Sequence, residues 1–152
     1  MKLSTFYNIY YKHRIKKAKF FNRIYLLATI IFRFFYVITV VEKKINIDKL
    51  VNNKKVLFNK NLNYLFQFFN SDKGFYYLDQ YSKKIQNKKV KCHAYSPFYE
   101  KHFYKLKEKK LNILELGSFK CAASAAFRFY FKNSTIYSAD LYPDLQKYFS
   151  KK

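Results

Sequence analysis

The chain begins with two hydrophobic patterns of different kinds. Residues 1–23 interleave seven basic residues with aromatic and aliphatic ones and contain no acid, which is typical of a basic, aromatic helix. Residues 24–41 (IYLLATIIFRFFYVITVV) are almost continuously apolar, with a single charge, Arg33, near the centre. No small-residue cleavage site follows, which argues against a secretory signal peptide.

The apolar segment 24–41 has three interpretations. Its residues would form a helix about 27 Å long against a bilayer core of about 30 Å, and summed transfer free energies permit insertion despite Arg33. Basic residues flank the segment on both sides, which opposes the positive-inside rule for a span. We favour a helix on the anionic cytoplasmic leaflet, then a helix packed against protein, then a span.

A polar, Asn- and Lys-rich connection over residues 42–70 leads to a short apolar helix at 62–69. The sequence NSDKG (70–74) breaks this helix. Gly74 is one of only two glycines in the chain, and a glycine after such polar residues predicts a turn or a helix end.

Residues 75–91 are rich in Tyr and Lys and give no clear pattern. After them, Pro97 suits a first helical turn, and Phe98, His102, Phe103 and Leu106 lie at helical spacing. We therefore predict a helix over residues 96–109.

The C-terminal part has the pattern of a βαβ unit. Residues 111–116 (LNILEL) predict a strand that ends at Gly117, the Ala-rich residues 122–131 predict a helix, and residues 134–139 (STIYSA) predict a second strand that ends at Asp140. In such a unit the first turn brings backbone N–H groups and a helix N-terminus close to a ligand. The sequence therefore predicts an α/β fold with a ligand site at this turn.

Two acids mark the ends of the predicted strands. Glu115 stands beside the glycine turn, and Asp140 lies 23 residues after Gly117. In such units an acid about twenty residues after the turn accepts hydrogen bonds from ribose hydroxyls. The turn has one glycine in place of G-x-G-x-x-G, which disfavours a pyrophosphate site. Two structural alternatives stay open: Glu115 could cap the following helix, and Asp140 could be an ordinary turn acid.

At these residues the chain resembles the class I S-adenosylmethionine-dependent methyltransferases. Residues 111–124 (LNILELGSFKCAAS) are similar to their first motif, and residues 134–140 (STIYSAD) to the second strand with its ribose-binding acid. Residues 71–74 (SDKG) and 93–103 (HAYSPFYEKHF) are similar to segments that precede the first motif in the sugar and macrolide O-methyltransferase branch, the macrocin and mycinamicin type. The resemblance covers about residues 70–145 and implies an incomplete Rossmann-like methyltransferase fold, preceded by an α-helical N-terminal extension.

The resemblance implies S-adenosylmethionine as cofactor and the hydroxyl of a small, sugar-like molecule as substrate. The residues that would surround the cofactor are Glu115 and Gly117 on the methionine and ribose side, the backbone of Ser118 and Phe119, Asp140 at the ribose and Leu141 at the adenine. The residues on the lid and substrate side would be Lys73, His93, Tyr95 and Tyr99. Relatives of this branch often use a divalent metal, but neither its ligands nor a catalytic base can be assigned in this chain.

The cysteines and histidines have structural explanations. The family commonly has a glycine where Cys121 stands. This departure narrows the conformational freedom of the turn, although a small thiol is tolerable there if φ is negative. We expect Cys121 to be a small buried residue, although Lys120 and a helix N-terminus would lower the pKa of its thiol. Cys92, His93 and His102 lack the spacing of a zinc site, so no metal site is predicted.

Composition and charge limit the classes of partner. The chain has 152 residues, half of them apolar and 22% aromatic, which excludes an intrinsically disordered protein. Its formal charge is +22, from 27 Lys and only 4 Arg against 9 acids. Because Arg is the preferred reader of bases and phosphates, we attribute much of this charge to Lys-rich composition and do not expect a nucleic-acid partner. The anionic membrane surface remains a partner for residues 1–41, which would make the protein cytoplasmic and peripheral at the inner face of the membrane.

The length then sets the expected organisation. We assign residues 1–60 to a basic, apolar helical extension, 61–110 to a helical lead-in and lid region, and 111–152 to the first βαβ unit. Because the family's sheet has more strands than this chain can supply, the sequence predicts the N-terminal portion of a longer enzyme, inactive alone. The competing hypothesis is a small basic protein without catalytic activity that binds a membrane surface or nucleic acid. The sequence makes no prediction about oligomeric state.

Overall fold

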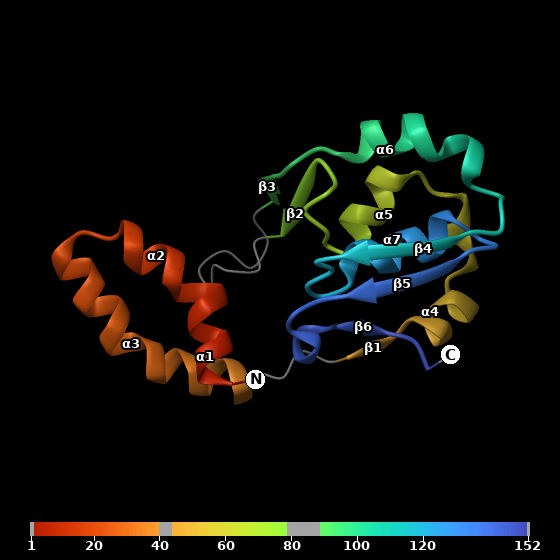
Figure 1. The fold of residues 1–152 in the computed structure, drawn as a ribbon. Coiled ribbons are helices and arrows are strands. Elements are labelled where there is room, and N and C mark those ends of the chain that lie inside the picture. The colour runs from red at the N-terminus through yellow and green to blue at the C-terminus, as the bar shows by residue number, and fades with distance from the viewer. Residues whose placement is uncertain (1, 40–43, 79–88, 152) are drawn as a thin grey trace. The chain divides into compact units, whose positions relative to one another are not determined.

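The protein has a mixed α/β fold with short parallel strands. The computed structural model describes residues 2–39, 44–78 and 89–151 (Figure 1). The chain forms two compact units, Met1–Lys43 and Lys44–Lys152. The division falls inside the region assigned from the sequence to the extension, residues 1–60.

The regular elements among the described residues of the first unit are all helical. Its elements are α1 (Leu3–Phe6), a π-helical segment η1 (Tyr7–Tyr11), α2 (Lys12–Lys17) and α3 (Phe20–Thr39). The chain leaves the helical conformation at Ala18, where ψ is 142°, and α3 then packs back against the earlier helices. The expected basic helix therefore exists but ends before residue 23, and residues 24–39 of the apolar segment belong to α3, while residues 40 and 41 lie outside the described part of the chain. Across the described residues, none of the helices combines the length and the apolar character needed to cross a membrane.

The second unit contains short helices and paired strands. Its helical elements are α4 (Ile47–Asn53), η2 (Lys55–Asn59), α5 (Leu62–Phe68), α6 (Ser96–Phe103), η3 (Tyr104–Leu106), α7 (Ala122–Tyr130) and η4 (Pro143–Leu145). Its strands are β1 (Ile45–Asn46), β2 (Tyr76–Leu78), β3 (Lys89–Lys91), β4 (Asn112–Leu116), β5 (Thr135–Ala139) and β6 (Tyr148–Phe149). The strands pair as parallel β1–β6, antiparallel β2–β3 and parallel β4–β5.

The predicted βαβ unit is confirmed as β4–α7–β5. The two strands are parallel and in register, with Ile113 opposite Ile136 and Glu115 opposite Ser138. Along both strands exposed and half-buried residues alternate, so Ile113, Glu115, Ile136 and Ser138 share the more buried face. This register brings the carboxyl ends of the two strands to the same edge, where ligands bind in open parallel sheets.

The core of the second unit lies where α7 contacts α5. Ala126, Phe129 and Tyr130 of α7 are fully buried, and so are Leu65 and Phe66 of α5. Small and large side chains alternate here: the alanines of α7 let the two helices approach, and the phenylalanines fill the space around them. α7 therefore anchors the turn that precedes it to a packed core.

The apolar helix predicted at 62–69 is confirmed as α5, but its end differs from the expectation. The left-handed residue that ends it is Asn70, with φ of 58°, and the Ser71 N–H donates to the Phe66 carbonyl at 2.7 Å. Gly74 instead lies buried against the helix, where a Cβ would stand 3.2 Å from the Cβ of Phe66. The absence of a side chain at Gly74 allows this close packing, and Asn70 performs the helix-ending role.

Several elements were not predicted. The polar connection contains α4, whose N-terminus is capped by the Asn46 side chain, the acceptor of the Lys49 N–H at 3.0 Å. The stretch 75–91, which gave no pattern, forms β2 and β3 where it is described, while residues 79–88 lie outside the described part of the chain. The helix predicted over residues 96–109 begins at Ser96 as expected, but its α-helical part ends at Phe103.

Candidate functional site

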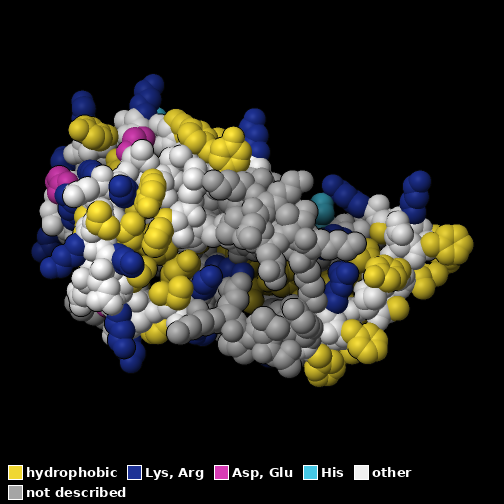
Figure 2. Space-filling view, turned by 180° about the vertical axis from the view of Figure 1, so that it is seen from behind, with side chains coloured by type: hydrophobic (Ala, Val, Ile, Leu, Met, Phe, Trp, Pro, Cys, Tyr) yellow, Lys and Arg dark blue, Asp and Glu magenta, His cyan; other side chains and the backbone are white. Residues whose placement is uncertain are grey.

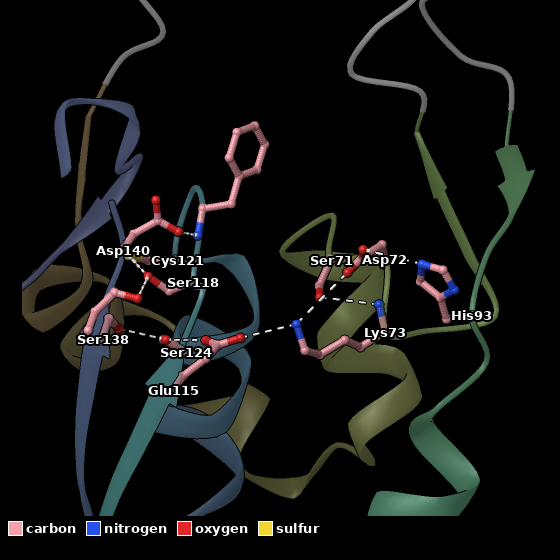
Figure 3. Close-up of polar contacts among 12 residues, drawn as sticks. Ser71, Asp72, Lys73, His93, Glu115, Ser118, Cys121, Ser124, Ser138 and Asp140 are labelled. Atoms are coloured by element: carbon pink, nitrogen blue, oxygen red, sulfur yellow. Dashed lines mark hydrogen bonds and ion pairs between the residues drawn. The ribbon is translucent and has the colours of Figure 1, made fainter. Parts of the chain in front are cut away.

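The turn 117–121 follows β4 and is hydrogen-bonded to the carboxyl end of β5. The Gly117 and Ser118 N–H groups both donate to the carbonyl of Ala139, at 2.9 and 3.2 Å. The Phe119 N–H donates to Oδ2 of Asp140 at 2.6 Å (Figure 3). The Tyr142 N–H donates to Oδ1 of Asp140 at 2.9 Å. The acid after the second strand is thus bound directly to the turn after the first.

The turn holds three residues in the left-handed region. Gly117 has φ of 75°, Phe119 of 47° and Cys121 of 59°. This conformation costs a residue with a side chain about 1–2 kcal/mol. The condition under which a thiol would be tolerable there, a negative φ, is therefore not met: Cys121 adopts the conformation that a glycine occupies without strain.

Cys121 itself is a buried structural residue. Its side chain is 4% exposed, and its thiol lies 3.6 Å from the Ser118 hydroxyl. Burial raises the pKa of the Cys121 thiol above its ordinary value, and the hydrogen bond to Ser118 offsets this only in part. The lowered pKa expected from Lys120 and the helix N-terminus is wrong because desolvation is the larger effect.

A chain of polar side chains begins at Glu115. Lys73 Nζ lies 3.1 Å from Glu115 Oε1, and Figure 3 shows the Lys73 side chain reaching from the loop after α5 to the end of β4. The Ser124 hydroxyl donates to Glu115 Oε2, and the Ser138 hydroxyl donates to Ser124 Oγ at 2.6 Å. The carboxylate of Glu115 is thus shared between a lysine and the first turns of α7.

The series of polar contacts continues on the other side of Lys73. Lys73 Nζ lies 4.0 Å from Asp72 Oδ1, and His93 Nε2 lies 3.7 Å from Asp72 Oδ2, which makes an ion pair when the imidazole is protonated. Burial by itself lowers the pKa of the Lys73 ammonium, but the Glu115 carboxylate overcomes this, so the pKa is raised overall. Lys73 therefore stays protonated at neutral pH and presents a fixed positive charge.

A pocket of about 120 Å³ opens between this loop and the turn 117–121. Its lining comes from two segments: Asn70, Ser71, Asp72 and Lys73 on one side, and Gly117, Ser118, Phe119, Lys120, Ala122 and Ala123 on the other. Two lysines and the N-terminal end of α7 favour a small anionic or carboxylate-bearing group here, while the carboxylate of Asp72, also in the lining, opposes it. The pocket is too small for a whole cofactor, since sites for such ligands measure roughly 300–1,000 Å³.

The aromatic residues expected on the lid side form a stack beside this polar chain. The His93 and Tyr95 rings lie 5.2 Å apart at 11°, and the Tyr95 and Tyr99 rings lie 6.2 Å apart, nearly perpendicular. Burial raises the pKa of the Tyr99 phenol, and the nearby Lys73 ammonium offsets part of that rise. Tyr99 also stacks on Phe103, so it belongs partly to the core.

The structure brings most of the predicted site residues together. Lys73, Gly117, Ser118 and Phe119 line one pocket, while Glu115 and Asp140 flank it. Leu141 is 88% exposed and makes no wall of this pocket.

Sequence reasoning did not identify Asp72, Ser124 and Ser138, which complete the polar chain. Ser138 carries a signal in retrospect, because strand alternation places it on the same face as Asp140, two residues on. Its shared face with Glu115 follows from the register, in which the two residues are opposite each other. Ser124 is the one polar residue in the Ala-rich start of α7.

The residues present fit part of S-adenosylmethionine. Each carboxylate oxygen of Asp140 accepts one backbone N–H and keeps a second lone pair, which leaves capacity for two hydroxyl donors. The Lys73 ammonium at the pocket suits the carboxylate of an amino acid. Among the described residues, no group of three or more His, Cys, Asp or Glu side chains is arranged to hold a metal ion.

Comparisons with protein-family models, with curated proteins and with solved structures found no match.

Proposed function

We propose that β4, α7 and β5 form the first βαβ unit of a Rossmann-like domain that binds S-adenosylmethionine for methyl transfer to a hydroxyl of a sugar-like substrate. One observation carries the proposal: the acid that follows the second strand accepts the N–H of Phe119 in the turn that follows the first, at 2.6 Å. This contact holds a carboxylate beside an open glycine turn, the arrangement that binds ribose hydroxyls in this class of fold.

The proposed roles follow from the chemistry of the side chains. Asp140 would accept hydrogen bonds from the ribose hydroxyls, and Gly117 leaves open space beside the turn, because a Cβ there would meet nothing within 4 Å. Lys73 would bind the carboxylate of the methionine end in the pocket. Glu115 holds Lys73 in place through its 3.1 Å contact. When bound, the cofactor supplies an electrophilic methyl group; the residues named here bind and orient it.

Calorimetric binding of S-adenosylhomocysteine to the full chain tests the proposal. Asp140→Asn keeps the shape of the side chain but removes its charge, and a hydrogen bond to a charged group contributes about 1.5–3 kcal/mol. We therefore expect at least about tenfold weaker binding from this variant. Asp48→Asn is the matched control, because Asp48 also accepts a backbone N–H, that of Lys151 at 3.0 Å, away from the site.

The result expected is measurable binding by the parent protein, weakened by Asp140→Asn and unchanged by Asp48→Asn. Absence of S-adenosylhomocysteine binding by the parent protein would refute the proposal. Equal loss in both variants would refute it as well, because the effect would then come from a loss of backbone anchoring in general.

A further inference from the structure

Helix α3 has one apolar face that packs inside the first unit. Leu26, Ile30 and Phe34, each four residues apart, contact the buried cluster of Phe6, Tyr11 and Ile15. The Phe6 and Phe34 rings lie 5.7 Å apart. This face accounts for the way α3 folds back onto α1, η1 and α2.

A second apolar face of α3 points away from this cluster. It consists of Phe21, Ile24, Tyr25, Phe32 and Phe35, which are 82%, 51%, 60%, 79% and 59% exposed and which we call the outer stripe. At about 100° per residue these positions fall on one side of the helix, opposite Ile30. Most of the surface of these five large side chains is in contact with solvent, which soluble proteins rarely tolerate in a contiguous patch.

The charged residues of the segment that carries the outer stripe all have one sign. Lys12, Arg14, Lys16 and Lys17 of α2 are exposed, and residues 1–41 contain no acid. Figure 2 shows apolar side chains of this helical unit with Lys and Arg side chains beside them. A partner that covers the stripe must accept large aromatic side chains, and the positive charge of residues 1–41 favours a negatively charged partner.

We propose that the outer stripe and the basic residues of α2 dock the protein on an anionic lipid surface. A bilayer interface accepts Phe, Ile and Tyr side chains without a preformed groove, and its anionic headgroups attract each nearby Lys or Arg by about 1 kcal/mol, a factor of about five in affinity. A double-stranded nucleic acid would neutralise the charge but leave Phe21, Ile24 and Phe32 uncovered. The chemistry of the stripe thus selects lipid, independently of the function proposed for the second unit.

Vesicle co-sedimentation of the full chain tests the proposal in two arms. We expect binding to phosphatidylcholine vesicles that contain phosphatidylserine to be at least about tenfold tighter than to phosphatidylcholine alone. Phe21→Ser with Phe32→Ser should weaken binding to the anionic vesicles by more than about tenfold, because each buried aromatic ring contributes strongly to partitioning. The matched control is Phe68→Ser with Phe98→Ser, two exposed phenylalanines of the second unit.

A second pair of variants keeps the test decisive if the stripe variant unfolds. Lys16→Glu with Lys17→Glu should weaken anionic binding by more than about tenfold, whereas Lys105→Glu with Lys110→Glu, the same change of net charge in the second unit, should not. Circular dichroism checks that each variant keeps its helices.

Several results would overturn the proposal. Equal binding to both kinds of vesicle, or equal loss in both charge variants, would show that α2 provides no local recognition. Vesicle-bound protein that resists extraction by high salt and alkaline carbonate would show insertion in place of surface docking. If duplex RNA competes with the vesicles for the protein, and the stripe substitutions leave this competition unaffected, the surface would be assigned to nucleic acid.

Discussion

At the scale of single residues, the contact between Lys73 and Glu115 determines the electrostatics of the candidate site. The two charged atoms lie 3.1 Å apart, and the side chains are only 24% and 9% exposed. An ion pair so shielded from water loses little to screening, and removal of one partner leaves the other charge without compensation. Both residues were named from the sequence, but their pairing was not, because they are 42 positions apart and belong to different elements.

We predict that Lys73→Met lowers the free energy of unfolding by about 1–3 kcal/mol at neutral pH, since Glu115 keeps its charge and loses its cation. The pKa of Lys73 is raised in the folded protein above its ordinary value of 10.5. The stabilisation is therefore fully present below pH 10.5 and is lost as the pH rises through the raised pKa. Urea unfolding of parent and variant across this range should show their difference shrink only in strong alkali.

The exposed pair Lys132 and Glu108 provides the control for this prediction. Its charged atoms lie at nearly the same distance, 3.2 Å, but the side chains are 34% and 61% exposed. Lys132→Met should therefore cost less than about 1 kcal/mol. A Lys73→Met variant as stable as Lys132→Met would contradict the shielding of the Lys73–Glu115 pair.

At the scale of elements, the turn 117–121 is strained by its sequence. Phe119 has φ of 47°, a conformation that glycine adopts freely and phenylalanine does not. We predict that Phe119→Gly raises the free energy of unfolding by about 0.5–1 kcal/mol, because relief of strain exceeds the entropy that glycine gains in the unfolded chain. Thermal unfolding followed by circular dichroism measures the change.

Phe98→Gly is the matched substitution in a regular element. Phe98 is exposed within α6, so glycine there should destabilise by about 1 kcal/mol through loss of helix propensity. If the two Phe→Gly substitutions change the free energy of unfolding in opposite directions, the backbone conformation is the cause. Destabilisation by Phe119→Gly would show that its ring, close to Lys120, contributes more than the strain costs.

The elements that sequence patterns predicted are those defined by local periodicity. The alternation in LNILEL and STIYSA and the run of alanines between them specify β4, β5 and α7 without distant contacts. By contrast, β1 and β6 are two residues each and pair across about a hundred positions, with Ile45 opposite Tyr148. Such a pairing leaves no periodic signal, because tertiary contacts alone determine it. The same reason explains why the bond from Ser138 to Ser124 could not be anticipated.

At the scale of the whole molecule, the two units have buried clusters of very different size. Among the described residues, the cluster of the first unit contains three buried residues, Phe6, Tyr11 and Ile15, while that of the second unit includes Leu62, Leu65 and Phe66 of α5 and most of α7. Units of about 40 residues rarely bury enough apolar surface for high stability alone. Exposure of the outer stripe of α3 to water further lowers the stability of this unit. Contact of the stripe with a lipid surface would be favourable. Low intrinsic stability of the first unit and the proposed docking are thus two consequences of one distribution of apolar side chains.

Because the two clusters are separate, we predict that damage to one leaves the other intact. Phe6→Ala and Phe129→Ala each remove a ring that is at most 2% exposed, a loss of about 3–5 kcal/mol in a packed core. In hydrogen exchange followed by mass spectrometry, Phe6→Ala should abolish protection in residues 3–39 and preserve it in 122–130. Phe129→Ala should do the reverse, and anionic vesicles should restore protection in α3 of the Phe6→Ala variant, because the bilayer replaces the lost apolar contacts. Simultaneous loss of protection in both units from either substitution would mean that the chain unfolds as one cooperative body and that the two cores are not independent.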